Sequence, residues 1–114
     1  MKILINRIII LILFLIISSP AFSQYWKEIT NIPAPYNNNY WLEIYISPTN
    51  SNYVWICGFN GYVIRTTDGG STWRGSQVPN ANHLESINFP TNQIGYVSGV
   101  EGIFKTTDGG TSWT

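Results

Sequence analysis

The sequence predicts an all-β protein built from two repeated, four-stranded β-propeller blades behind a cleavable leader. Three observations support this prediction. The chain after the leader is rich in aromatic residues, Gly, Asn, Ser and Thr and poor in charge, a composition typical of short strands joined by many turns. An eight-residue segment recurs after 40 residues. A period near 40 residues with several short strands per unit is the signature of propeller blades.

Residues 1–23 are expected to be a secretory signal peptide. Two basic residues precede the unbroken apolar run Ile8–Ile17, and Ala21-Phe22-Ser23 forms a cleavage site before Gln24. The run has ten residues, about half of the roughly 20 that a spanning helix needs. We therefore expect a secreted, cell-surface or periplasmic protein that keeps no membrane span after cleavage.

Charge and cysteine content exclude several classes of function. The part after residue 23 has four basic and six acidic residues, a net charge of −2, so it lacks the basic surface that nucleic-acid binding requires. Cys57 is the single cysteine and cannot form an internal disulfide. Its strand-like surroundings predict a buried, unreactive thiol.

The repeat defines two units, 42–83 and an incomplete 84–114. Thr66–Trp73 recurs as Thr106–Trp113 at an offset of 40. The similarity continues upstream. Gly58 and Gly61 match Gly99 and Gly102 at an offset of 41. At an offset of 42, Leu42-Glu43 matches Leu84-Glu85, and Pro48-Thr49-Asn50 matches Pro90-Thr91-Asn92. The first copy therefore has one extra residue in each of two places, which we expect in loops or bulges.

Each unit is expected to contain four strands. In the first unit they are predicted at 42–46, 54–57, 62–67 and from Thr72 onward. Asn60-Gly61 predicts a tight hairpin, because both central positions of a primed turn favour positive φ. In the second unit the strands are predicted at 84–89, 96–98, 103–107 and from Ser112 onward.

Residues 24–41 are expected to form an N-terminal strand and loop. Trp26-Lys27-Glu28-Ile29 followed by Pro33 resembles the end of a fourth strand, as Trp73 followed by Pro79 does. We predict that this strand completes the last blade of a ring, which removes two free sheet edges. Two units cannot close a ring of four to eight blades. The remaining blades are expected in the same, longer chain, or alternatively in other copies.

The repeated segment matches the pattern S/T-x-D-x-G-x-T/S-W, the Asp box or BNR repeat. The matching residues are Thr66, Asp68, Gly70, Thr72 and Trp73 in the first copy and Thr106, Asp108, Gly110, Ser112 and Trp113 in the second. With a basic residue before TTDGG (Arg65 or Lys105), residues 42–113 resemble the photosystem II stability/assembly factor-like propellers.

The residue types of the Asp box indicate a structural role. A carboxylate at the start of a tight turn accepts hydrogen bonds from the following backbone N–H groups. One of the two glycines is expected to take the positive φ. Thr66 and Thr72 are expected to pair across the hairpin, and Trp73 and Trp113 to pack on a neighbouring sheet. Each box has one carboxylate, too few for a calcium site, so no metal or cofactor is expected.

The resemblance implies a non-enzymatic scaffold or binding module with a protein or glycan partner. Loops on rigid scaffolds carry recognition, and the segment 36–41 is rich in aromatic and amide groups. Its candidate ligand contacts are Tyr36, Asn38, Tyr40 and Trp41. The alternative is a polar inter-blade loop in which Trp41 is buried at the start of a strand, and this alternative is favoured because aromatic residues mostly pack.

A fragment of a sialidase-like glycoside hydrolase is the alternative function. Sialidases also carry Asp boxes, which lie away from their active site. That chemistry needs an arginine cluster and paired catalytic groups, whereas the chain after the leader has only Arg65 and Arg74. Glu43 and Glu85 are interpreted as equivalent repeat positions with a structural role. No catalytic residue is predicted, and the lone His83 is expected at the surface.

Overall fold

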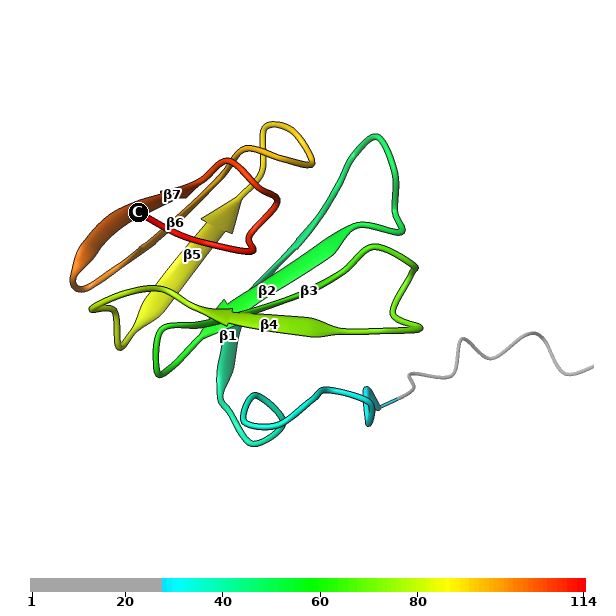
Figure 1. Ribbon diagram of the computed structural model, residues 1–114, viewed down its shortest axis with the longest axis horizontal. Coiled ribbons are helices and arrows are strands. Elements are labelled where there is room, and N and C mark those ends of the chain that lie inside the picture. Colours follow the sequence, from blue (N-terminus) through cyan, green and yellow to red (C-terminus); the bar gives the residue numbers. More distant parts are fainter. Residues whose placement is uncertain (1–27) are drawn as a thin grey trace, which may run out of the picture.

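The computed structural model describes residues 28–114. The predicted signal peptide, its cleavage site and the first residues of the predicted N-terminal strand lie outside this range. The described chain has seven strands in two antiparallel sheets and no helix (Figure 1). Within residues 28–114, accordingly, no helix has the length and hydrophobicity to cross a membrane. The predicted all-β class is confirmed.

Each sheet is a meander of strands in chain order, as in a propeller blade. The first contains β1 (Trp41–Ile46), β2 (Val54–Gly58), β3 (Tyr62–Thr66) and β4 (Arg74–Gln77). The second contains β5 (Leu84–Asn88), β6 (Gly95–Gly99) and β7 (Gly102–Thr106). Beyond β7, Thr114 exchanges two backbone hydrogen bonds with Lys105, of 2.8 and 2.9 Å. A fourth strand therefore begins to pair there, as Arg74 pairs with Arg65 in the first sheet.

The β2–β3 hairpin forms through the predicted turn. Asn60 and Gly61 have φ values of 58° and 65°, the left-handed conformation that a primed two-residue turn requires. Gly61 also lies against the loop after β4, where a Cβ atom would come within 2.2 Å of the Ala81 carbonyl oxygen. This position therefore requires glycine both for its φ and for its space.

The strand register corrects the predicted alignment of the two units at β1 and β5. It pairs Trp41 with Gly58 and Glu43 with Cys57 in the first sheet, and Leu84 with Gly99 and Ser86 with Ser98 in the second, with a bulge after Trp41 and after Leu84. Trp41 thus corresponds to Leu84, and Glu43 to Ser86. The predicted equivalence of Glu43 with Glu85 is wrong. Burial agrees, because Leu42 is 45% exposed whereas Leu84 is fully buried.

Two apolar clusters lie on opposite sides of the first sheet. The larger fills the junction between the sheets and contains Trp55, Cys57, Val63, Val78, Ala81, Leu84, Ile87, Phe89, Val97 and Trp113. The smaller contains Ile56, Ile64 and Trp73, with Ile32, Tyr36, Trp41 and Val54 packed against it. The first sheet is therefore apolar on both faces, as expected for a blade with neighbours on two sides.

Candidate protein-interaction site

The first Asp box is a turn closed by its own carboxylate. Asp68 Oδ1 accepts from the Thr72 backbone N–H at 2.9 Å and from the Thr66 hydroxyl at 2.7 Å, and Oδ2 accepts from the Thr72 hydroxyl at 2.6 Å. Thr66 Oγ1 in turn accepts from the Gly70 N–H at 2.9 Å. Thr66 and Thr72 therefore bond to Asp68 and not to each other, in contrast to the predicted cross-hairpin pair.

The second Asp box repeats this arrangement. Asp108 accepts from the Ser112 N–H at 2.9 Å, the Ser112 hydroxyl at 2.6 Å and the Thr106 hydroxyl at 2.7 Å. Both glycines of each box have positive φ, between 69° and 90°, where one was predicted. The hydroxyl and N–H of Thr72 and the hydroxyl of Thr66 lower the pKa of Asp68 to about 2. Donors from Ser112 and Thr106 hold the pKa of Asp108 lower still.

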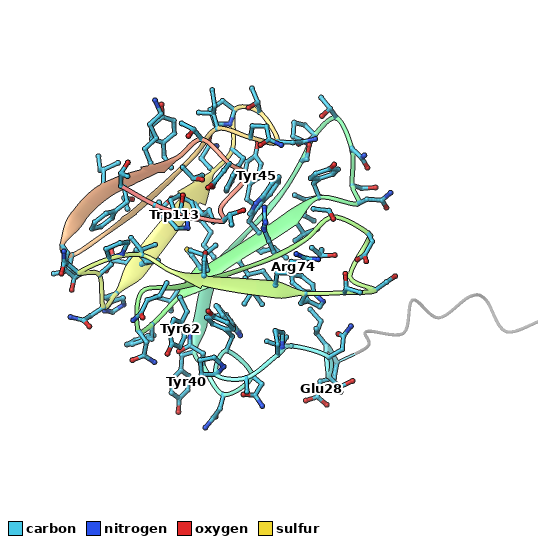
Figure 2. All side chains as sticks on the ribbon, viewed as in Figure 1. Glu28, Tyr40, Tyr45, Tyr62, Arg74 and Trp113 are labelled. Carbon is cyan, nitrogen blue, oxygen red and sulfur yellow. The ribbon has the colours of Figure 1, made fainter. Side chains whose placement is uncertain are left out.

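The first sheet contacts the second through one of its faces, which we call the junction face. Directly opposite residues in neighbouring strands share a face of the sheet. The register therefore places two rows on this face, Glu43, Cys57, Val63 and Ser76, and Tyr45, Trp55, Arg65 and Arg74. Figure 2 shows Tyr45 in the region between the two sheets, near Trp113 of the second.

The junction face makes specific polar contacts with the second sheet. Glu43 accepts from the Ile87 N–H at 2.6 Å, and the Tyr45 hydroxyl donates to the Phe89 carbonyl at 2.9 Å. The Trp55 ring stacks on Phe89 at a centroid distance of 3.9 Å. Glu43 thus has a structural role, whereas Glu85 is exposed.

The backbone carbonyls of the second Asp box accept further hydrogen bonds from the first sheet. The Gly109 carbonyl accepts from Trp55 Nε1 at 2.9 Å and from Arg65 Nη1 at 2.8 Å. The Gly110 carbonyl accepts from the Ser76 hydroxyl at 2.8 Å, and this hydroxyl accepts from Trp113 Nε1 at 3.2 Å. The Asp box therefore holds its own turn and also fastens one sheet to the next.

A small polar pocket lies at the edge of this junction. It has a volume of about 180 Å³ and is lined by Arg65, Thr66, Thr67, Thr72 and Arg74. We call it the cationic pocket. Burial lowers the pKa of Arg65, and the nearby Asp108 carboxylate opposes this effect. The hydrogen bonds of Arg65 go to carbonyls and to the Thr111 hydroxyl, so none of them places a carboxylate against its charge.

The amino-acid sequence did not predict this pocket. Arg65 and Arg74 are nine residues apart, but the Asp-box turn brings them directly opposite each other on β3 and β4. Like charges in such cross-strand positions destabilise a sheet. In the sequence, the tight Asp-box turn between two basic residues was the feature that could have indicated their pairing. The Thr66 and Thr72 hydroxyls of the pocket already donate to Asp68, so the two guanidinium groups are the part of it that is suited to binding a carboxylate.

The structure separates the four predicted ligand contacts. Tyr36 packs on the first sheet, with its ring 4.9 Å from that of Tyr62, and Trp41 packs against the smaller apolar cluster. Tyr40 is 79% exposed and Asn38 is exposed as well. Figure 2 shows Tyr40 and Tyr62 at the same end of the molecule. The four side chains do not form one open surface, and their contact with a ligand stays a prediction.

The segment before β1 lies against the first Asp box. The Asn31 side-chain amide donates to the carbonyls of Gly70 at 3.3 Å and Ser71 at 2.8 Å. The corresponding Gly110 carbonyl accepts from Ser76 of β4. Asn31 thus contacts the first Asp box in the way that Ser76, a residue of a fourth strand, contacts the second. Residues 28–31 themselves are not in a strand. Ring closure by this segment stays a prediction.

A second pocket separates this segment from the first sheet. Its volume is about 430 Å³, and its lining includes Ile44, Ile46 and Val54 of the sheet, Trp73 just before β4, and residues 28–31. In the described part of the chain, no group of three or more His, Cys, Asp or Glu residues is arranged to hold a metal ion.

Comparison with known proteins identifies related sequences and structures. Residues 19–114 match the family model described as photosynthesis system II assembly factor YCF48. A solved structure described as YCF48 bound to D1 peptide is 28% identical, with a TM-score of 0.55 over 67% of this chain and 25% of that chain. The chain thus spans about a quarter of the length of that solved protein. No curated protein matches the chain.

Proposed function

Because this chain belongs to the photosynthesis system II assembly factor YCF48 family, we propose that it is a non-enzymatic propeller module that binds an extended polypeptide. The solved YCF48 structure described with a bound D1 peptide supports a protein partner. The observation that carries the proposal is the cationic pocket, which presents Arg65 and Arg74 side by side at the end of a rigid hairpin.

We propose that this pocket holds a carboxylate of the peptide. Arg65 is fixed by its bonds to Gly109 and Thr111, so little side-chain freedom is lost when it binds. Arg74 is exposed and completes the pair. An acidic side chain or a free C-terminus would relieve the repulsion between the two guanidinium groups. Glycan partners lack this charge unless they are acidic, so a peptide is the preferred ligand.

The test uses a labelled acidic peptide, which has Asp and Glu side chains and a free C-terminus, and its neutral counterpart, which has Asn and Gln in their place and an amidated C-terminus. We expect Arg74→Ala to weaken binding of the acidic peptide by about tenfold or more, because a charge-assisted bond contributes about 1.5–3 kcal/mol. Lys105→Ala is the matched control, because it removes a cation outside the pocket. Equal binding of the two peptides in fluorescence anisotropy, or equal loss in both variants, would contradict the proposal.

We also propose that the module acts outside the cytoplasm. The support is the apolar run at 8–17 followed by the cleavage site before Gln24. Expression in a bacterial host should give a secreted product whose N-terminal sequence begins at Gln24. A cytoplasmic product that retains residues 1–23 would contradict this proposal.

A further inference from the structure

Arg65 reaches across the junction and binds the second Asp box at three points. Its Nη1 donates to the Gly109 carbonyl at 2.8 Å and to the Asp108 carbonyl at 3.4 Å, and its Nη2 donates to the Thr111 hydroxyl at 2.7 Å. A guanidinium has five N–H donors, one on Nε and two on each terminal nitrogen. The Nε–H and one N–H of Nη2 therefore have no acceptor among the described residues. Nε and Nη2 share one edge of the planar group, and such an edge binds a carboxylate bidentately.

Thr111 is itself held in place by the aspartate of its box. Its backbone N–H donates to Asp108 Oδ1 at 2.9 Å, and its hydroxyl donates to the Asp108 carbonyl at 3.0 Å. A hydroxyl has one proton to donate, so the Thr111 oxygen meets Arg65 only as an acceptor. The turn therefore fixes where this oxygen lies and which way its lone pairs face, and with them the position of Arg65 Nη2.

The first Asp box shows that this contact is separate from the shape of the turn. The Ser71 hydroxyl, at the position of Thr111, donates to the Asp68 carbonyl at 3.1 Å. This bond is common to both turns, whereas among the described residues only the Thr111 hydroxyl also accepts a bond from an arginine. The pattern S/T-x-D-x-G-x-T/S-W leaves the position unrestricted, so the turn requires no particular residue there. Thr111 therefore has a role beyond its own turn.

The site combines two neighbouring sheets. Arg65 and Arg74 come from β3 and β4 of the first sheet, and Thr111 comes from the turn after β7 of the second. Both sides of this contact belong to the described part of the chain, so it does not depend on further blades. At the positions of Arg65 and Arg74, the second sheet has Lys105 and Thr114, whose backbones pair. Among the described residues, the arginine pair therefore belongs to this junction alone.

We propose that Thr111 is a positioning residue of the cationic pocket. By holding Nη2, it presents the Nε–Nη2 edge of Arg65 to one carboxylate of the ligand, and Arg74 supplies the second cation. This inference rests on the function proposed above. A carboxylate fits the edge with two charge-assisted bonds, whereas an uncharged amide offers a single acceptor oxygen. The Asp box thus sets the preference of the preceding blade for an acidic ligand, and the pocket is complete only when the two blades are packed together.

The test compares three variants for binding of the labelled acidic peptide and its neutral counterpart by fluorescence anisotropy. Thr111→Val keeps the shape of the side chain and removes the hydroxyl. It should weaken binding of the acidic peptide about fivefold, the effect of one lost hydrogen bond, and leave the neutral peptide unaffected. Thr111→Ser keeps the hydroxyl and should bind as the unmodified chain does. Ser71→Ala is the matched control and should also leave binding unchanged, because it removes the equivalent bond to Asp68 and no bond to an arginine.

A second readout needs no ligand. The heteronuclear NOE of the Arg65 Nε–H group reports the order of the guanidinium, and it should fall in Thr111→Val but not in Thr111→Ser or Ser71→Ala. An unchanged NOE would overturn the proposal, as would equal weakening of both peptides by Thr111→Val. Binding that is weakened by Arg74→Ala but not by Thr111→Val would overturn the positioning role and leave the proposed function standing. Equal binding of both peptides by the unmodified chain would overturn both.

Discussion

At the scale of the residue, Asp68 and Asp108 close the same turn in different surroundings. Each carboxylate accepts bonds from the hydroxyl and N–H four residues later. The turn of Asp108 also offers its carbonyls to Trp55, Arg65 and Ser76 at the junction. Among the described residues outside the first sheet, the turn of Asp68 is contacted by Asn31 of the N-terminal segment. The two aspartates therefore have the same sequence context, but the turn of Asp108 is the one that supports the contact between the sheets.

Removing the two carboxylates should reveal this inequality. We expect Asp108→Ala to lower the free energy of unfolding by about 1–3 kcal/mol through unsatisfied turn amides. Asp68→Ala should lower it less in this chain, because within residues 28–114 no second sheet contacts its turn. Urea denaturation followed by tryptophan fluorescence measures both. Asp108→Asn, which keeps one acceptor oxygen, serves as the control and should fall between Asp108→Ala and the unmodified chain. Equal losses for the two alanine variants would contradict this account.

The same bonds predict acid sensitivity. The pKa of Asp68 falls to about 2 on folding, and that of Asp108 is also lowered. In the unfolded chain both carboxyls take up protons near their usual pKa of about 3.9. Between about pH 4 and pH 2 the unfolded state thus binds more protons, and stability falls as pH falls. Melting temperatures from pH 2 to 7 should show this slope, and the Asp68→Asn/Asp108→Asn double variant should flatten it. An unchanged slope would be contrary evidence.

At the scale of the element, the segment before β1 behaves as an attached part of the first sheet. Asn31 binds the Asp-box carbonyls and Ile32 packs against the smaller apolar cluster. Asn31→Ala should therefore lower the free energy of unfolding by about 0.5–1.5 kcal/mol, the usual net contribution of a hydrogen bond. Asn37→Ala, in an exposed position of the same segment, is the control and should change it little. Chemical denaturation that gives equal values for the two variants would show that the segment is not fastened through Asn31.

The elements also show what local sequence can and cannot predict. The Asn60-Gly61 turn was predictable because the φ requirement belongs to those two residues. The bulge after Trp41 was not, because Leu42-Glu43 and Leu84-Glu85 match in letters while the strand register shifts by one residue. The position of Arg65 opposite Arg74 likewise depends on the register in which β3 and β4 pair. Periodicity thus predicts that strands exist, whereas pairing decides which side chains meet.

At the scale of the whole molecule, the two sheets of residues 28–114 pack against each other through one apolar junction. The repeat predicted blades, and the family match and the architecture agree with this prediction. The repeat did not indicate which face of each blade meets its neighbour. That assignment depends on rows of side chains such as Tyr45, Trp55 and Arg65, which become adjacent only after the strands pair.

The Asp boxes also have a consequence for the order of folding. Within a box, the hydrogen bonds join residues at most four positions apart. The bond from Trp55 to Gly109 spans 54 positions. Closing a short loop costs less entropy and takes less time than closing a long one. We therefore expect the acceptor carbonyls of each box to be set in place before the preceding sheet packs against them. The blades would then assemble on turns that are already shaped, and the junction would form late in folding.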